Sequence, residues 1–150
     1  MNNDRPQRDG RGKNDHGNYG RPKNTFEQLD IRPMELPEDY VQEAENVIKK
    51  GHKISTSKIR SILSLVSDIY NDENIRTEAA LLKSSKERIQ LMRVRILYEA
   101  GRDSNVKKFI EESHLINYIK SIGDSREKFI IFARYMEALV AYHKFVYGND

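Results

Sequence analysis

Proline is confined to the first quarter of this chain, and that distribution constrains the fold more than any other feature. All four prolines lie at or before Pro37, so residues 38–150 contain no proline to break a helix. In that region apolar side chains recur at intervals of three and four, as in Ile59, Ile62 and Leu63, which is the spacing of one helix face. No strand pattern or internal repeat stands out. The sequence therefore predicts an all-α protein.

Several segments carry this helical pattern. We expect helices over about residues 38–50, 56–70 and 73–100, a less sharply bounded helical stretch between Ser104 and Gly123, and a last helix over about 125–147, opened by an Asp124 and Glu127 capping box. The stretch 73–100 would span roughly 40 Å. It carries apolar residues on two nearly opposite sides, so we expect it to be central. The predicted fold is a compact bundle of about five helices with a long central helix.

The N-terminal region differs from the rest in composition. Residues 1–24 hold four of the eight glycines and six Lys/Arg against three Asp, with almost nothing apolar, so they cannot bury enough surface to offset their ordering entropy. We therefore divide the chain into a disordered basic Arg/Gly/Asn-rich tail, residues 1–33, and a helical domain, residues 34–150. Loose Arg/Gly segments can add affinity for single strands, and a tail with no binding role is the alternative.

The residues that most enzymes and metal sites need are missing or scattered. The chain has no cysteine, which excludes disulfides and thiolate zinc sites and fits a reducing, cytoplasmic setting. Its four histidines stand at positions 16, 52, 114 and 143, without metal-ligand spacing, and there is no glycine-rich phosphate loop. His143 falls on an apolar stripe and is interpreted as a core or interface histidine. We expect no catalytic residue, no metal, no cofactor and no membrane span.

The segment HKISTSKIRS, residues 52–61, places Lys53, Lys58 and Arg60 at the start of a predicted helix. Cations are mildly unfavourable there because the helix dipole is positive at its N-terminus. Backbone N–H groups, three hydroxyls and these cations together could bind a phosphate. On this segment alone, the simpler interpretation is favoured: Ser55 or Thr56 caps the helix and the cations are solvated.

Further cations lie on the later helices. Arg88, Arg93 and Arg95 lie within the stretch 73–100, together with Tyr98; Arg102 follows just after it, and Arg134 lies on the last helix. Guanidinium groups pair with phosphates, and tyrosines offer stacking surfaces for bases. Residues 25–150 hold twenty residues of each charge, so a narrow track for a single-stranded backbone is favoured over a broad duplex-binding patch.

Three segments resemble a known family. TSKIRSILSL at 56–65, RVRILYEAGR at 93–102 and ARYMEALVAYHKFVYG at 133–148 are similar to the small, all-helical subunit of the type III-A CRISPR effector, the Csm complex. The resemblance covers about residues 38–148 and leaves the N-terminal tail without a counterpart.

The resemblance implies a non-catalytic subunit present in several copies, stacked head to tail as a minor filament. Its implied partners are copies of itself, the crRNA-bearing backbone subunit, the large signalling subunit, and single-stranded target RNA paired to the crRNA. Contact with the RNA sugar-phosphate chain is expected without sequence preference, at the cations of the matching segments and the loop before them: Lys53, Lys58, Arg60, Arg93, Arg102 and Arg134. The alternatives are a spacer that contacts only protein and, less favoured, a helical DNA-binding regulator.

Overall fold

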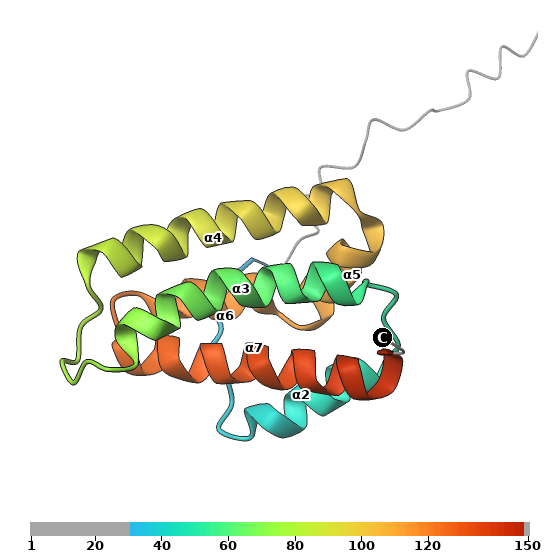
Figure 1. Cartoon of the computed structure of the whole chain (residues 1–150), viewed down its shortest axis with the longest axis horizontal. Helices are drawn as coiled ribbons and strands as arrows, with labels where there is room; N and C mark the ends of the chain where they lie inside the picture. The colour runs from blue at the N-terminus through green and yellow to red at the C-terminus, as the bar shows by residue number, and fades with distance from the viewer. Residues whose placement is uncertain (1–30, 149–150) are drawn as a thin grey trace, which may run out of the picture.

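The computed structural model describes residues 31–148, and within this range the chain is helical with no strand (Figure 1). The helices are α2 (Tyr40–Lys49), α3 (Thr56–Glu73), α4 (Lys83–Arg102), α5 (Ser104–Glu112), α6 (Leu115–Ile122) and α7 (Arg126–Tyr147). The prediction of an all-α bundle is confirmed. The tail predicted for residues 1–33 lies outside the described residues except for its last three. None of the described helices has both the length and the apolar character that crossing a bilayer requires.

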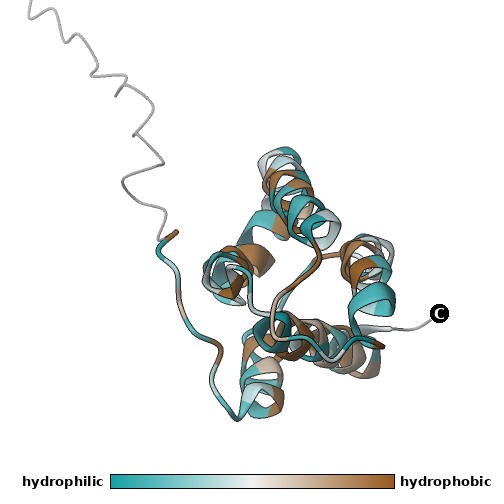
Figure 2. Cartoon of the chain, turned by 90° about the vertical axis from the view of Figure 1, so that its left-hand side faces the viewer, coloured by the Kyte–Doolittle hydropathy of each residue, from teal (hydrophilic) through white to brown (hydrophobic). Residues whose placement is uncertain are grey.

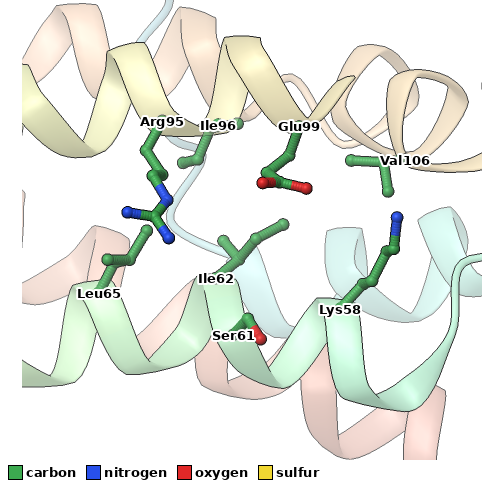
Figure 3. Close-up of a pocket in the computed structure, with 8 residues that line it drawn as sticks. All are labelled: Lys58, Ser61, Ile62, Leu65, Arg95, Ile96, Glu99 and Val106. Atoms are coloured by element: carbon green, nitrogen blue, oxygen red, sulfur yellow. The ribbon is translucent and has the colours of Figure 1, made fainter. Parts of the chain in front are cut away.

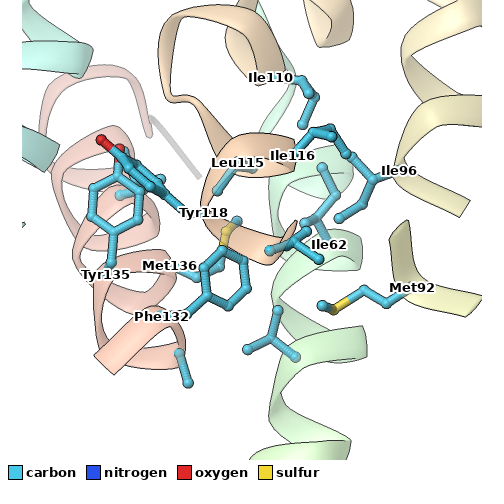
Figure 4. Packing of buried hydrophobic residues seen from close by; sticks show 14 of the residues in the cluster. Ile62, Met92, Ile96, Ile110, Leu115, Ile116, Tyr118, Phe132, Tyr135 and Met136 are labelled. Carbon is cyan, nitrogen blue, oxygen red and sulfur yellow. The ribbon is translucent and has the colours of Figure 1, made fainter. Parts of the chain in front are cut away.

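The central helix of the bundle is α7. It packs against α2, α3 and α6, and it buries large side chains along most of its length, including Phe129, Phe132, Tyr135 and Leu139. Figure 4 shows Phe132 and Met136 of this helix meeting residues of α3, α4 and α6 in the core. The spacing of apolar residues along α7 therefore reflects a helix that other helices cover on more than one side.

The helix predicted to be central, α4, lies instead at the edge of the bundle, where it packs against α3, α5 and α6 (Figures 1 and 2). Ile89, Met92 and Ile96 point into the core, as expected for one of its two apolar faces. The other face is exposed. The prediction of a long central helix in this segment was wrong because an apolar stripe on a helix does not say whether this chain or another one covers it.

The predicted helix over residues 73–100 was also wrong at its start. The chain leaves α3 after Glu73 and enters α4 only at Lys83. The buried carboxylate of Glu73 accepts hydrogen bonds from the backbone N–H of Leu82, at 2.9 Å, and from Nη1 of Arg76, at 2.7 Å. Its carboxylate thus satisfies the backbone N–H of Leu82, the residue directly before α4, which has no side-chain cap hydrogen bond of its own. These contacts depend on the folded chain and leave no periodicity in the sequence.

The connections around α5, α6 and α7 refine the other predicted boundaries. The stretch between Ser104 and Gly123 divides into two helices at His114, whose φ of 55° is left-handed and ends the preceding turn. Helix α7 is capped by Ser125, whose Oγ accepts from the Lys128 N–H at 3.2 Å. The predicted capping residue, Asp124, instead offers its carbonyl oxygen to the Leu81 N–H at 2.9 Å. The loop 74–82 is therefore tied to the start of α7.

A short extended segment precedes α2 and lies against α6. The Met34 N–H donates to the carbonyl oxygen of Asn117 at 3.0 Å, and Nζ of Lys120 donates to that of Ile31 at 2.8 Å. Lys128 of α7 also pairs with Glu35, with 2.9 Å between Nζ and Oε1. The first described residues are thus held on the side of the bundle formed by α6 and α7.

Candidate nucleic-acid interface

The start of α3 combines a cap with a long-range ion pair. Ser55 is the N-cap, with its Oγ accepting from the Lys58 N–H at 3.2 Å, which confirms the capping interpretation. The ammonium of Lys58 lies 2.8 Å from Oδ2 of Asp103. The hydrogen bond from Lys58 holds the pKa of the Asp103 carboxyl below its usual range. Lys58 therefore already has an anionic partner within the chain.

A groove runs between α3 and α4 beside this ion pair (Figure 3). Its cavity has a volume of about 280 Å³. Arg95 and Glu99 reach into it from α4 and Lys58 from α3, while the floor is apolar and consists of Ile62, Ile96 and Val106. Charged groups thus line the rim of a shallow apolar trough that opens to solvent.

Arg102 extends this cationic rim along α4. It follows Arg95 by seven residues, which is two helical turns, so both arginines lie on nearly the same side of the helix. The Arg102 guanidinium carbon lies 5.6 Å from the ring centroid of the exposed Tyr98, a cation–π geometry. Its Nη1 is 3.7 Å from Oε1 of Glu99. We call Lys58, Arg95 and Arg102 the α3–α4 cationic edge.

The structure does not bring all six predicted RNA-binding residues into one surface. Arg60 follows Lys58 by two positions, which is roughly 200° around a helix, so it lies on the opposite edge of α3. Arg93 is related to Arg95 in the same way and lies on the edge of α4 that faces away from α3. Arg134 is exposed on α7, and Lys53 is exposed in the connection before α3. These six residues were predicted from the sequence as one group, but in the folded chain they lie on different sides of the bundle.

Arg95 was recognised as a cation in the sequence but was not selected as a contact. Its place in the groove follows from the repeat of Arg88, Arg95 and Arg102 at intervals of seven, which puts all three on the side of α4 nearest α3. Arg88 pairs there with Asp72 of α3. The seven-residue repeat is the feature of the sequence that could have identified Arg95.

Several of these cations have no partner in the described chain. The side chains of five of them make no ion pair or hydrogen bond with any other residue between 31 and 148: Lys53, Arg60, Arg93, Arg95 and Arg134. Other arginines do have partners within the chain: Arg76 pairs with Glu73 and Glu78, and Arg126 donates hydrogen bonds to two backbone carbonyl oxygens. The unpaired cations therefore form a distinct class that is open to an external anion.

The buried histidines have structural partners. Nε2 of His143 lies 2.9 Å from the carbonyl oxygen of Ile54, which confirms its interpretation as a core histidine. Nε2 of His52 lies 2.9 Å from Oε2 of Glu112. Burial lowers the pKa of His52, and the nearby Glu112 carboxylate opposes this only in part. Both histidines fasten the connection between α2 and α3 to the rest of the bundle.

Comparison with known proteins gives consistent matches over most of the chain. The family model described as Csm2 Type III-A matches residues 34–149. A protein named CRISPR system Cms protein Csm2 from Mycobacterium tuberculosis is 35% identical over 120 residues, covering 77% of this chain and 97% of its own. Its namesake from Streptococcus thermophilus is 39% identical over 120 residues, covering 75% and 95%. A third, from Enterococcus italicus, is 29% identical over 99 residues, covering 65% and 71%.

Proposed function

This chain belongs to the Csm2 Type III-A family and is a subunit of a type III-A CRISPR complex. From that premise we propose that it is a non-catalytic subunit, and that it contacts the sugar-phosphate backbone of the target RNA. In this proposal it acts in the cytoplasm and is present in several copies beside the crRNA-bearing backbone subunit and the large subunit. Each copy supports the paired target without reading its sequence.

The observation that carries this proposal is the set of unpaired cations described above. The described chain is rich in carboxylates, yet Arg60, Arg95 and Arg134 remain exposed with no anionic partner among residues 31–148. Exposed guanidinium groups without a partner remain free to pair with an anion supplied from outside. A polyanionic backbone supplies such anions at regular intervals.

We assign the first RNA contact to the α3–α4 cationic edge. Arg95 is unpaired at the groove, and Arg102 and Tyr98 continue the same edge toward the end of α4. Lys58 is half exposed and can share its ammonium between Asp103 and a phosphate. Lys53, Arg60 and Arg134 provide further phosphate contacts outside the groove. This arrangement suits sequence-independent binding because the contacts are cationic, and contacts with phosphates carry no information about the base.

The test is target-RNA binding by the reconstituted complex over a range of salt concentrations. Arg60→Ala combined with Arg102→Ala should weaken binding of every target sequence to a similar extent and reduce the dependence on salt. Lys49→Ala combined with Lys128→Ala is the charge-matched control, because both lysines are already paired, with Glu45 and Glu35. If the arginine variant bound with unchanged affinity and salt dependence, the site assignment would be wrong.

The alternative function is a spacer that contacts only protein, and the exposed apolar face of α4 favours contact with protein at that face. Cross-linking of the complex to labelled target RNA separates the two functions. A spacer would give no cross-link to this subunit. Turnover of RNA or nucleotide by the isolated protein would contradict a non-catalytic role.

A further inference from the structure

A carboxylate lies between two cations of the α3–α4 cationic edge. Glu99 follows Arg95 by four residues and precedes Arg102 by three, so it lies on the same side of α4 as both. Its side chain reaches into the groove between α3 and α4 (Figure 3). Because like charges repel, a carboxylate at this place weakens the binding of phosphate, and its position in the edge needs another explanation.

The oxygens of Glu99 retain most of their capacity to accept hydrogen bonds. Among residues 31–148 the side chain pairs with Arg102 alone, and the 3.7 Å between Oε1 and Nη1 is longer than a hydrogen bond. The side chain is 28% exposed, so a ligand in the groove can reach it. An ionised carboxylate has about four lone-pair sites and no hydrogen to donate. Glu99 can therefore accept from a ligand but cannot donate to it.

The hydroxyl across the groove is also limited to accepting. Ser61 lines the groove from α3, and its Oγ donates to the carbonyl oxygen of Ser57 at 2.9 Å. With its hydrogen used in this way, Ser61 can serve a ligand only as an acceptor. The floor below is apolar, with Ile62 and Ile96. The groove thus combines cations that suit phosphates with acceptors that require a donor from the ligand.

The sugar-phosphate chain of RNA has one kind of hydrogen-bond donor, the ribose 2′-hydroxyl. We propose that Glu99 accepts a hydrogen bond from a 2′-hydroxyl of the target strand and makes the edge selective for RNA over DNA. Arg95 and Arg102 are seven residues apart, roughly 10 Å along α4, so phosphates held by the two leave room for a ribose at Glu99 between them. In DNA the same carboxylate meets no donor and only repels the backbone.

This inference rests on the proposed function, because it requires an RNA backbone at the α3–α4 cationic edge. It adds that the edge distinguishes the sugar without distinguishing the bases. A site that hydrogen-bonds a hydroxyl of its ligand rejects the analogue that lacks it, because the protein group is left without its partner. Since Glu99 is partly exposed, water replaces some of the lost hydrogen bond, and the selectivity should be moderate.

The test combines one change in the protein with one change in the target, in the reconstituted complex. Single 2′-deoxy substitutions are introduced at successive positions of the guide-paired target RNA, and each dissociation constant is compared with that of the all-ribose target. With the parent protein we expect a loss of affinity of up to about tenfold at a subset of positions, as for a hydrogen bond to a charged group. In Glu99→Ala the same substitutions should cost nothing.

Two further variants identify what Glu99 contributes. Glu99→Gln keeps an acceptor oxygen without the charge, so part of the 2′-deoxy penalty should remain. Glu87→Ala is the matched control, because this glutamate is exposed on the same helix and lies outside the groove, and it should keep the full penalty. Glu99→Ala should also bind DNA of the target sequence more tightly than the parent does, since the repulsion is removed.

An equal 2′-deoxy penalty in the parent and in Glu99→Ala would overturn the inference. So would a Glu99→Ala variant that binds RNA and DNA targets more tightly by the same factor, because the carboxylate would then act only by repulsion.

These outcomes are distinct from those of the salt test. Weaker RNA binding by the Arg60→Ala and Arg102→Ala variant, with an unchanged 2′-deoxy penalty in Glu99→Ala, would contradict the role of Glu99 alone. A penalty that disappears in Glu99→Ala, while the arginine variant binds normally, would support the role of Glu99 and contradict the arginine contacts alone.

Discussion

The ammonium of Lys58 lies 2.8 Å from the carboxylate of Asp103, which joins the first turn of α3 to the start of α5. The same carboxylate caps α5, with Oδ1 accepting from the Asn105 N–H at 2.9 Å. The anion therefore offsets the unfavourable position of a cation at a helix N-terminus. The charge of Lys58 is accommodated within the chain, and an RNA phosphate is not needed to explain why it is tolerated there.

Two substitutions at Asp103 should separate its two roles. Asp103→Asn removes the ion pair but keeps a residue that caps helices well, whereas Asp103→Ala removes both. We expect both variants to unfold at lower temperature than the parent, with the larger decrease for alanine. Thermal unfolding followed by circular dichroism measures this. Equal decreases would mean that the cap contributes nothing beyond the ion pair.

Arg95 and Lys58 should differ in their contribution to RNA binding. Arg95 is unpaired, so Arg95→Ala should weaken target-RNA binding by the complex and reduce the slope of log affinity against log salt by about one. Lys58→Ala should change the slope by less, because Asp103 already neutralises much of its charge. Fluorescence anisotropy at several salt concentrations gives both slopes. The reverse order would show that Lys58 leaves Asp103 when RNA binds.

Glu73 should be among the most sensitive polar positions for stability. Glu73→Gln removes the nearer of the two carboxylates that pair with Arg76 and weakens the hydrogen bond from the Leu82 N–H, so we expect a loss of about 2–3 kcal/mol in the free energy of unfolding. Urea denaturation at neutral pH measures it. Glu78→Gln is the matched control on an exposed carboxylate that contacts the same arginine. A comparable loss in both variants would exclude a special role for the buried group.

The carboxylate of Glu73 should also make the stability of the fold depend on pH. Burial acts to raise the pKa of Glu73, but hydrogen bonds from its neighbours, including Arg76 and the Leu82 N–H, outweigh this and lower the pKa below 4.5. A lowered carboxyl pKa stabilises the fold above 4.5, and this contribution is lost as pH falls below that value. In Glu73→Gln the loss of stability below pH 4.5 should be smaller.

His52 should make the protein less stable in mildly acidic solution. Its pKa is lowered chiefly by burial, with Lys108 and His143 acting in the same direction and Glu112 opposing them. The unfolded chain therefore takes up a proton near pH 6.5, before the folded one does, and stability declines as pH falls through that value. Urea midpoints between pH 7.5 and 5.5 measure the decline.

Replacing the imidazole of His52 tests whether this residue causes the decline in stability. In His52→Leu the decline should be smaller, whereas His114→Asn should keep it, because His114 is partly exposed and asparagine tolerates its left-handed backbone. An equal decline in the parent and in His52→Leu would assign the effect to another group.

Most of the helices could be predicted from the sequence because helical spacing is a local property. The helix over 40–49 and the one beginning at Thr56 follow from residues no more than a few turns apart. The break after Glu73 could not be predicted in the same way. It depends on a buried carboxylate bonding the Leu82 N–H and on Arg126 of α7 donating to the carbonyl oxygen of Glu73 at 3.0 Å.

The candidate interface was likewise predictable only in part from the sequence. The sequence by itself determined that this is a helical chain with cations in three places: at the start of one helix, along a second and on the last. Only the tertiary structure decided which cations are free. Lys58 is paired because Asp103, forty-five residues away, is carried next to it when α4, which ends at Arg102, packs against α3, while Arg95 reaches the same groove and finds no partner among the described residues. Pairing depends on distances in space between residues far apart in the chain, and spacing along a sequence does not contain those distances.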